Sequence, residues 1–392
     1  MNAEQLTSFR AAYSRFALDE RILLSAHSHQ AWPDVAREAQ LEVFDETARL
    51  VDDKWDQAVL PIMDEVGKKI LVRLGFEPRD AIAFAESTHQ LVFRLLSTLD
   101  LSAKPRVVTT SSEFHSLHRQ LMRLGEDGLD VHWVDATERE RLTDRLLEAI
   151  VPGVSLVALS AVLFEDAYIV QRLDEVIARG QEVGALVLVD AYHAFNVVPL
   201  QFGPQRENLF VTAGGYKYAG FGEGLCFLRI PANCELRPAY TGWFADFGAL
   251  AEPRDLGRRI SYASGGARFA GATFETSAVF RARAVLAHWE RFGLGVTELR
   301  QISSRQTARI IARLDEAALG GDLVSSRDSE RRAGFVTLRV NRAKDVVVAL
   351  RERGVYADAR GDLLRLGPAP YLLDEEIDRG VACLREVVEA LA

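Results

Sequence analysis

Two segments of the sequence each end in a residue that could take part in the same chemistry. The apolar segment 186–189 contains no polar residue until Asp190, and the apolar segment 208–215 leads directly into Tyr216 and Lys217. In doubly wound α/β sheets, ligands bind at the carboxyl ends of the strands, so Asp190 and Lys217 are expected at one binding edge. A lysine among aromatic rings and glycines is unfavourable there unless it is exposed or chemically employed, because desolvation lowers its pKa and leaves a nucleophilic amine.

An aspartate and a lysine in this arrangement match the requirements of pyridoxal 5'-phosphate (PLP). The lysine forms a Schiff base with the cofactor, and the carboxylate keeps the pyridine nitrogen protonated, so that the ring acts as an electron sink. Asp190 could instead only cap a turn, and Lys217 could be an exposed loop lysine, but His193 and the glycines around Lys217 favour the cofactor. The glycine-rich run at 220–224 precedes a strand rather than opening a helix, which does not fit a dinucleotide-binding motif.

The elements that would position these residues alternate along the chain. Short apolar runs are separated by segments with helical spacing, of which 137–150 and 172–184 are long enough for crossover connections. Several runs are apolar at successive positions, which is typical of parallel strands buried on both faces of a sheet. The runs are AIAF at 81–84, RVVTTS at 106–111, LDVHWVD at 129–135, SLVALSAV at 155–162, ALVLVDAYHAF at 185–195, NLFVTAGG at 208–215 and LCFLRI at 225–230.

The remaining segments define the predicted domain organisation. Residues 1–24 read as an amphipathic helix and a short apolar stretch, and 34–75 has helical spacing with a break near Pro61. After a Gly- and aromatic-rich region at 236–274, a long helix is expected at 276–292, followed by two strands, 335–340 and 363–368, set between helices. We therefore predict an N-terminal arm (1–50) that packs on the small domain and the pocket, a large α/β domain (51–275) and a smaller α+β C-terminal domain (276–392).

Composition limits the class of protein and its partners. The 392 residues are 48% hydrophobic and 26% charged, which is typical of soluble globular proteins. The net charge of -9 and the lack of a basic block argue against nucleic-acid or anionic-membrane partners. Three scattered cysteines fit a reducing compartment, and no apolar run approaches the roughly 20 residues of a membrane helix. The N-terminus lacks the apolar core of a signal peptide, so we expect a cytoplasmic protein.

The motifs D-A-Y-H at 190–193 and G-Y-K-Y at 215–218 resemble those of the class V aminotransferase group of fold-type I PLP enzymes. Within that group they are most similar to kynureninases, which carry D-x-x-H and S-Y-K-Y at a similar separation, and the resemblance extends over most of the chain. It implies the aspartate aminotransferase-like fold, with a large PLP-binding domain whose mostly parallel, seven-stranded-type sheet lies between helices. It also implies an amino-acid substrate and a homodimer with shared active sites.

The resemblance implies a role for each matching residue around the cofactor. Lys217 forms the Schiff base and moves protons at the substrate α-carbon, Asp190 pairs with the pyridinium, and His193 helps to fix that carboxylate and the ring. Tyr216 is a further catalytic candidate. The phosphate would be held by Ser87, Thr88, Tyr216, Trp243 and Thr273, the last two from the other subunit, while Phe114 would stack on the pyridine ring. Taken alone, Ser87 and Thr88 could also be a plain helix N-cap pair.

Around the substrate the sequence departs from the kynureninase pattern. Arg365 matches the arginine of an R-x-x-P-x-P stretch that binds the substrate carboxylate bidentately, although in a strand of leucines it could also be an outward-facing edge residue. The loop 26–30 reads A-H-S-H-Q where kynureninases read close to G-N-S-L-G, so we expect the substrate to be recognised differently. His27 and His29 of this loop are candidate substrate-binding or acid–base groups.

Three functions are consistent with these patterns. The first is a PLP-dependent enzyme that cleaves the Cβ–Cγ bond of an amino acid hydrolytically, as kynureninases do, or catalyses a related lyase reaction. The second is a class V aminotransferase that uses the same cofactor. The third, from another class, is a metal-dependent hydrolase or a non-catalytic homologue, with ligands among His27, His29, His115 and His118 but no accompanying HExxH motif. A desulfurase is disfavoured, because Cys226 lies in an expected strand and Cys383 in the expected last helix rather than on a mobile loop.

Overall fold

The centre of the protein is a seven-stranded sheet with the strand order β2-β8-β7-β6-β5-β3-β4 in the computed structural model, which describes residues 1–251, 257 and 259–391. Strands β3 to β7 run parallel to one another, and β2 and β8 close one edge with antiparallel pairings. The predicted α/β class and mostly parallel sheet are therefore confirmed. The strands are β2 (Ala81–Ala85), β3 (Arg106–Thr110), β4 (Asp130–Val134), β5 (Val154–Ser160), β6 (Leu186–Asp190), β7 (Leu209–Gly214) and β8 (Cys226–Ile230).

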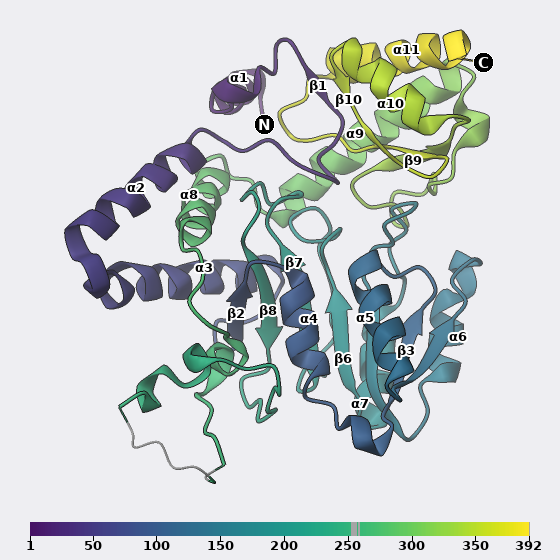
Figure 1. Cartoon of the computed structure of the whole chain (residues 1–392). Coiled ribbons are helices and arrows are strands. Elements are labelled where there is room, and N and C mark those ends of the chain that lie inside the picture. Colours follow the sequence, from purple (N-terminus) through teal and green to yellow (C-terminus); the bar gives the residue numbers. More distant parts are fainter. Residues whose placement is uncertain (252–256, 258, 392) are drawn as a thin grey trace.

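Successive residues of the central strands enter two different hydrophobic cores. In β6, for example, Val187 and Val189 belong to one core, and Leu188 between them belongs to the other. Helices α4 (Thr88–Leu96) and α5 (His115–Glu126) supply apolar side chains to the second core, whereas α6 (Leu142–Ala149) and α7 (Leu173–Glu182) supply them to the first. Figure 1 shows these helices around the sheet. Helices on both faces explain why the strands are apolar at consecutive positions.

The N-terminal helices pack beside this sheet. Helix α2 (Val35–Leu50) and helix α3 (Leu60–Arg73) both contact α8 (Ser277–Arg291). The predicted break near Pro61 lies earlier, in a 3-10 turn at Val51–Asp53 and a π-helical turn at Trp55–Val59. Pro61 itself is in the first turn of α3, where a proline removes no intrahelical hydrogen bond.

The C-terminal part forms a small α+β domain with its own three-stranded antiparallel sheet, ordered β11-β12-β9. Its long helices lie at the end of the molecule that also holds the N-terminal segment (Figure 1). Its elements are α9 (Val296–Glu316), β9 (Val336–Arg339), α10 (Ala343–Glu352), β10 (Val355–Tyr356), β11 (Asp358–Arg360), β12 (Leu363–Leu366) and α11 (Asp374–Leu391). Short 3-10 segments occur at Ser14–Phe16, Leu101–Ala103, Arg139–Arg141, Trp243–Ala249, Gly265–Phe269 and Gly320–Asp322.

The N-terminal segment is attached to this C-terminal domain. Strand β1 (Ile22–Leu23) pairs in parallel with β10, and Arg10 of helix α1 (Ala3–Ala11) forms an ion pair of 2.9 Å with Glu376. Beyond β1, the backbone of Ser25 forms a bridge with Gly367. The loop 26–30 therefore starts from the small domain. The domain boundaries at 50 and 275 remain a prediction.

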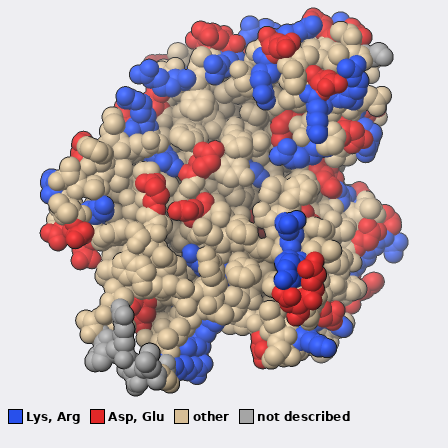
Figure 2. Space-filling view, in the orientation of Figure 1, with Lys and Arg blue, Asp and Glu red and all other residues tan. Residues whose placement is uncertain are grey.

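The surface carries charges of both signs. On the face drawn in Figure 2, Lys and Arg side chains are intermixed with Asp and Glu, mainly near its edge, and no continuous basic area is visible on this face. Within the same described ranges, none of the helices combines the length and the apolar character needed to cross a membrane.

Candidate active site

The carboxyl ends of β5, β6 and β7 meet at one edge of the sheet and surround a cavity of about 210 Å³. Asp190 is the last residue of β6, and Lys217 follows the end of β7 by three residues. Gly214, which ends β7, is required by packing, because a Cβ there would lie 2.3 Å from the hydroxyl oxygen of Tyr192. The cavity brings together seven of the predicted site residues: Ser87, Thr88, Phe114, Asp190, His193, Tyr216 and Lys217.

Lys217 is a buried amine at this cavity. Its side chain is 5% exposed, and its Nζ lies 2.7 Å from Nε2 of His193 and 4.6 Å from the ring centre of Tyr192. Burial lowers the pKa of Lys217 to about 7, although the negative charge of Asp190 acts in the opposite direction. A substantial fraction of the amine is therefore unprotonated near neutral pH, which is the form that attacks an aldehyde.

Asp190 faces the same cavity from the neighbouring strand. Its Oδ1 accepts a hydrogen bond of 2.9 Å from the backbone N–H of Tyr192, which fixes the carboxylate. Burial raises the pKa of Asp190, while this hydrogen bond and the charge of Lys217 lower it. A cationic ring nitrogen bound in the cavity would give this carboxylate the partner that its burial requires.

The N-terminus of α4 forms another wall of the cavity. Ser87 is the N-cap of this helix, and its Oγ accepts a hydrogen bond of 3.4 Å from the backbone N–H of Gln90. Ser87 is thus an N-cap, one of the two roles considered for it, and it also lines the cavity together with Thr88. A helix N-terminus with two hydroxyls beside it is suited to bind a phosphate group.

Aromatic rings enclose the amine. The ring centre of Phe114 lies 5.3 Å from Nζ of Lys217, and that of Tyr216 lies 5.8 Å from it. His29 from the N-terminal loop stacks on Tyr216 with 4.9 Å between ring centres, but its side chain is 64% exposed.

His193 contacts Lys217 rather than Asp190, and its buried Nδ1 has no hydrogen-bond partner. The role of His193 in fixing the Asp190 carboxylate therefore stays a prediction.

Arg365 and His27 lie behind the cavity rather than in its lining. Arg365 is 2% exposed and binds the carboxylate of Asp358 through Nε and Nη2, while its Nη1 donates to the backbone oxygen of Phe164 at 2.7 Å. His27 is fully buried, and its Nε2 lies 2.7 Å from Oδ1 of the same Asp358. That Arg365 and His27 contact a substrate remains a prediction. Asp358, which binds both of them, was not identified from the sequence.

Trp243 and Thr273 lie outside this cavity. Trp243 is 43% exposed and packs against Phe244, with 4.2 Å between ring centres. Thr273 lines a separate cavity of about 440 Å³, which also contains Phe244 and Phe274. We predicted that both residues reach the phosphate of the other subunit, and this remains a prediction.

Two further residues at the strand ends were missed. Ser160 ends β5 and is the register partner of Asp190, so the signal that identified Asp190, a polar residue closing an apolar strand, could have found it. Glu113 is buried and accepts hydrogen bonds of 2.6 Å from Ser160 and from Thr110. Burial raises the pKa of Glu113 to about 7, although both hydroxyl hydrogen bonds lower it. A second acid therefore lies beside the cavity, one residue before Phe114.

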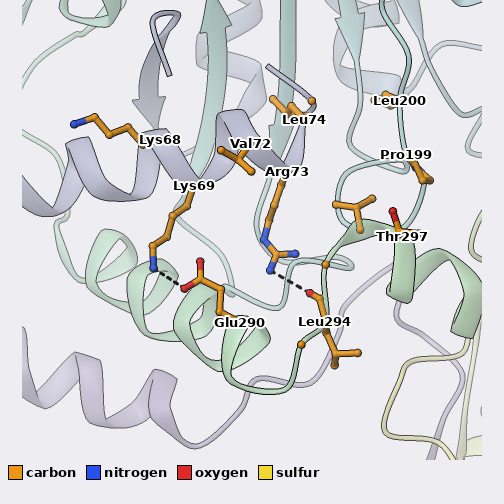
Figure 3. A pocket seen from close by; sticks show the side chains of 14 residues that line it. Lys68, Lys69, Val72, Arg73, Leu74, Pro199, Leu200, Glu290, Leu294 and Thr297 are labelled. Carbon is orange, nitrogen blue, oxygen red and sulfur yellow. Dashed lines mark hydrogen bonds and ion pairs between the residues drawn. The ribbon is translucent and has the colours of Figure 1, made fainter. Parts of the chain in front are cut away.

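Other hollows are less suited to chemistry. A hollow of about 750 Å³ lies between α3 and the turn that joins α8 to α9 (Figure 3). Its cations are already satisfied, because Lys69 binds Glu290 at 2.9 Å and Arg73 donates to the backbone oxygen of Leu294 at 3.2 Å. Among the described residues, no group of three or more His, Cys, Asp and Glu side chains is arranged to hold a metal ion. The metal-dependent alternative therefore has no candidate ligand set in that part of the chain.

The donor set of the strand-end cavity fits PLP. It offers a buried amine for the aldehyde, a carboxylate for the ring nitrogen, an aromatic ring beside the amine, and a helix N-terminus for the phosphate. The unpartnered Nδ1 of His193 adds a polar group close to that amine. Each group that this cofactor requires has a counterpart at this edge of the sheet.

Known proteins resemble the chain in sequence and in fold. Residues 299–384 match the family model of the kynureninase C-terminal domain. A kynureninase of Geobacillus thermodenitrificans is 24% identical over 86% of this chain and 81% of its own, and an uncharacterized aminotransferase of Bacillus subtilis, YcbU, is 23% identical over 79% of both chains.

Solved structures share the fold at lower identity. A mutant of the cystine C–S lyase C-DES, with glycine covalently linked to its PLP cofactor, superposes with a TM-score of 0.80 at 19% identity, over 96% of this chain and 99% of that one. The cysteine desulfurase CsdA of Escherichia coli has a TM-score of 0.80 at 16% identity, over 99% of both chains.

The parallel sheet, the strand-end lysine and aspartate, and the small C-terminal domain define the fold-type I class. Within this class, the chain has the class V aminotransferase fold and resembles kynureninases in sequence. The comparisons also support PLP as the cofactor, as predicted from Lys217 and Asp190.

Proposed function

We propose that this protein is a PLP-dependent enzyme that acts on an amino acid, by kynureninase-like hydrolytic cleavage of a Cβ–Cγ bond or a related lyase reaction. One observation carries the proposal. The buried amine of Lys217 and the carboxylate of Asp190 face one cavity from neighbouring strand ends. The match of residues 299–384 to the kynureninase C-terminal domain supports the choice of reaction.

The chain's own residues would bind and orient the cofactor. PLP supplies an electron sink that stabilises negative charge at the substrate α-carbon. Lys217 would hold the cofactor through Nζ, Asp190 would keep its ring nitrogen protonated, and Phe114 would supply an aromatic ring beside it. The N-terminus of α4, with Ser87 and Thr88, would bind the phosphate.

Proton transfer would fall to groups around the same amine. Lys217 would be the base that removes the α-proton, since its pKa of about 7 leaves the amine partly unprotonated at neutral pH. His193, 2.7 Å from Nζ, can accept a hydrogen bond from the amine and orient it. Tyr216 lines the cavity and is the candidate for later proton transfers.

Arg365 and the N-terminal loop would recognise the substrate. Arg365 is a buried cation that would bind the carboxylate of the substrate. Its positive charge helps to lower the pKa of Lys217. His29 stacks on Tyr216 at the rim, with its Nε2 3.5 Å from Oε1 of Glu223, and its exposed ring would contact a side chain that enters the cavity.

A class V aminotransferase is the second candidate. The resemblance to YcbU favours it, because that relative is described as an aminotransferase and covers most of this chain. Both reactions begin with removal of the α-proton by the same amine. They differ in the later steps, since a transaminase leaves the cofactor in its amine form and a hydrolase releases part of the side chain.

We also propose that the protein forms a homodimer. Apolar side chains that are more than a third exposed gather in the segment 240–250, including Tyr240, Trp243, Phe247 and Leu250. A patch of this kind favours association. Multi-angle light scattering would test the dimer, and a monomer at micromolar concentration would contradict it.

The test of the enzyme begins with purified protein. We expect it to bind PLP with a yellow absorbance band, and Lys217→Ala to lose this band while keeping the wild-type circular dichroism. Lys68→Ala, at an exposed position, is the matched control. Amino acids are then screened for a change in the band, and the products are identified. A cleaved side-chain fragment supports the hydrolase or lyase, and accumulation of the amine form of the cofactor supports the transaminase. A yellow Lys217→Ala protein would refute the proposal.

A further inference from the structure

Arg365 already has a carboxylate partner inside the protein. Asp358 of β11 is its register partner in the antiparallel pair β11–β12. The carboxylate accepts from Nε of Arg365 at 2.9 Å and also from its Nη2, so it occupies one complete edge of the guanidinium. The backbone oxygen of Phe164 accepts from Nη1 at 2.7 Å. The cation is thus fixed on two sides in a region where it is only 2% exposed.

Asp358 is itself held by the N-terminal loop. Nε2 of His27 lies 2.7 Å from Oδ1 of Asp358. The His27 ring is clamped, since it stacks on Phe335 with 4.7 Å between ring centres, and a Cβ on Gly367 would lie 2.2 Å from its Nδ1. Burial lowers the pKa of His27 to about 4, although its hydrogen bond to Asp358 acts in the opposite direction. The imidazole is therefore neutral at pH 7, and its Nε2–H donates to the carboxylate.

Charges around Asp358 keep it ionised. Burial alone would raise the pKa of this carboxyl, but the hydrogen bonds from His27 and Arg365 lower it well below its usual range. Arg360 adds a further positive charge, with its Nη2 3.6 Å from Oδ2. The result is a continuous arrangement from the loop to the arginine: a clamped imidazole, an ionised carboxylate and a guanidinium.

The hydrogen-bond count of Arg365 limits how it can bind a ligand. A guanidinium has five N–H donors, of which Asp358 takes two and Phe164 takes one. One N–H on each terminal nitrogen remains. Those two donors are the ones that a second carboxylate could use, and the hydrogen bonds to Asp358 and to Phe164 together fix their direction.

We propose that Asp358 is a positioning residue for substrate recognition, which directs the two remaining N–H groups of Arg365 toward the carboxylate of the substrate. In this assignment, His27 acts through Asp358 and does not contact the substrate. The proposal rests on the proposed function, because it presumes that an amino acid binds at the cofactor. It explains why the loop histidine is buried against the small domain, whereas His29 two residues later is exposed.

Glycine and methylamine are the probes that test this role. They differ only by the carboxylate, and glycine has no side chain to cleave. Their dissociation constants are measured on the PLP-loaded protein from the change in cofactor absorbance at equilibrium, which does not depend on turnover. We expect wild-type protein to bind glycine at least about tenfold more tightly than methylamine, and Arg365→Ala to abolish this ratio.

The decisive variants are at Asp358. Asp358→Ala should reduce the glycine-to-methylamine preference by about fivefold or more, with the methylamine affinity changed less than about twofold. Asp358→Asn keeps the shape and one acceptor, so it should lose less, and it serves if the alanine variant does not fold. His27→Ala should move the ratio in the same direction as Asp358→Asn. Asp362→Asn is the matched control, because Asp362 pairs with exposed Arg339 beyond the same turn.

The outcomes separate this proposal from the proposed function. No absorbance change with either probe would refute the proposed function, whereas a ratio that Arg365→Ala leaves intact would refute substrate binding at Arg365. A ratio that falls in Arg365→Ala but not in the Asp358 variants would overturn the positioning role. Tighter glycine binding in Asp358→Asn would also overturn it, because Asp358 would then compete with the ligand. Equal weakening of both probes would show that Asp358 only supports the fold.

Discussion

Replacing Lys217 by methionine should stabilise the protein from which the cofactor has been removed. The pKa of this amine is lowered from 10.5 to about 7 by burial. Between these two values, the unfolded chain binds more protons at this position than the native protein does, so the free energy of unfolding rises with pH. The cost of the buried amine is up to about 4 kcal/mol at pH 7 and about 2 kcal/mol at pH 9. Methionine has a similar volume and no charge, and it removes this cost.

The assay is urea unfolding of apo-protein at pH 7, 8 and 9, followed by tryptophan fluorescence and circular dichroism. Wild-type protein should gain about 2 kcal/mol from pH 7 to pH 9 through this residue, and Lys217→Met should lack that gain and be the more stable form at pH 7. Lys68→Met is the matched control, because Lys68 is exposed and its ion pair with Asp64 spans a single helical turn. Equal pH dependence in wild type and Lys217→Met would refute the buried amine and, with it, the reason for its reactivity.

Three further changes have expected outcomes. Asp190→Asn removes the charge beside the cofactor ring and should lower kcat about a hundredfold or more with the circular dichroism unchanged, as measured on the substrate found in the screen; unchanged kcat would count against its role. Phe114→Ala should weaken PLP binding by about 1 kcal/mol, measured by equilibrium dialysis of cofactor, and full affinity would place the ring elsewhere. Gly367→Ala should destabilise the protein by about 1–3 kcal/mol in urea unfolding, because the added methyl would overlap His27; an unaltered midpoint would show that this loop yields easily.

The sheet could be predicted because its signal is local. Each apolar run overlaps a strand, and in β6 the first polar residue of the run, Asp190, is also the last residue of the strand. One helix boundary differs from the prediction. The break between α2 and α3 falls at 51–59 rather than near Pro61, because a proline in the first turn of a helix interrupts nothing.

The individual side-chain contacts that join the N-terminal loop to the small domain could not be predicted. The pairing of Asp358 with Arg365 depends on the register of a short hairpin, and β11 has only three residues, too few for a periodic pattern. The link from His27 to Asp358 joins the two ends of the chain, and no local signal reports it. The resemblance to kynureninases therefore identified Arg365 and His27 as candidates but not the acid that connects them.

The pairing of β1 with β10 has a consequence for how the protein is made. Ile22 and Leu23 leave the ribosome first among the strands, whereas their partners Val355 and Tyr356 are synthesised near the end. Contacts between such remote segments form late, because the whole intervening chain must first be ordered. The loop that carries His27 would therefore fold only after translation is nearly complete. A nascent chain halted before β10 would contain all seven strands of the central sheet, but its N-terminal loop would not yet be packed against the small domain.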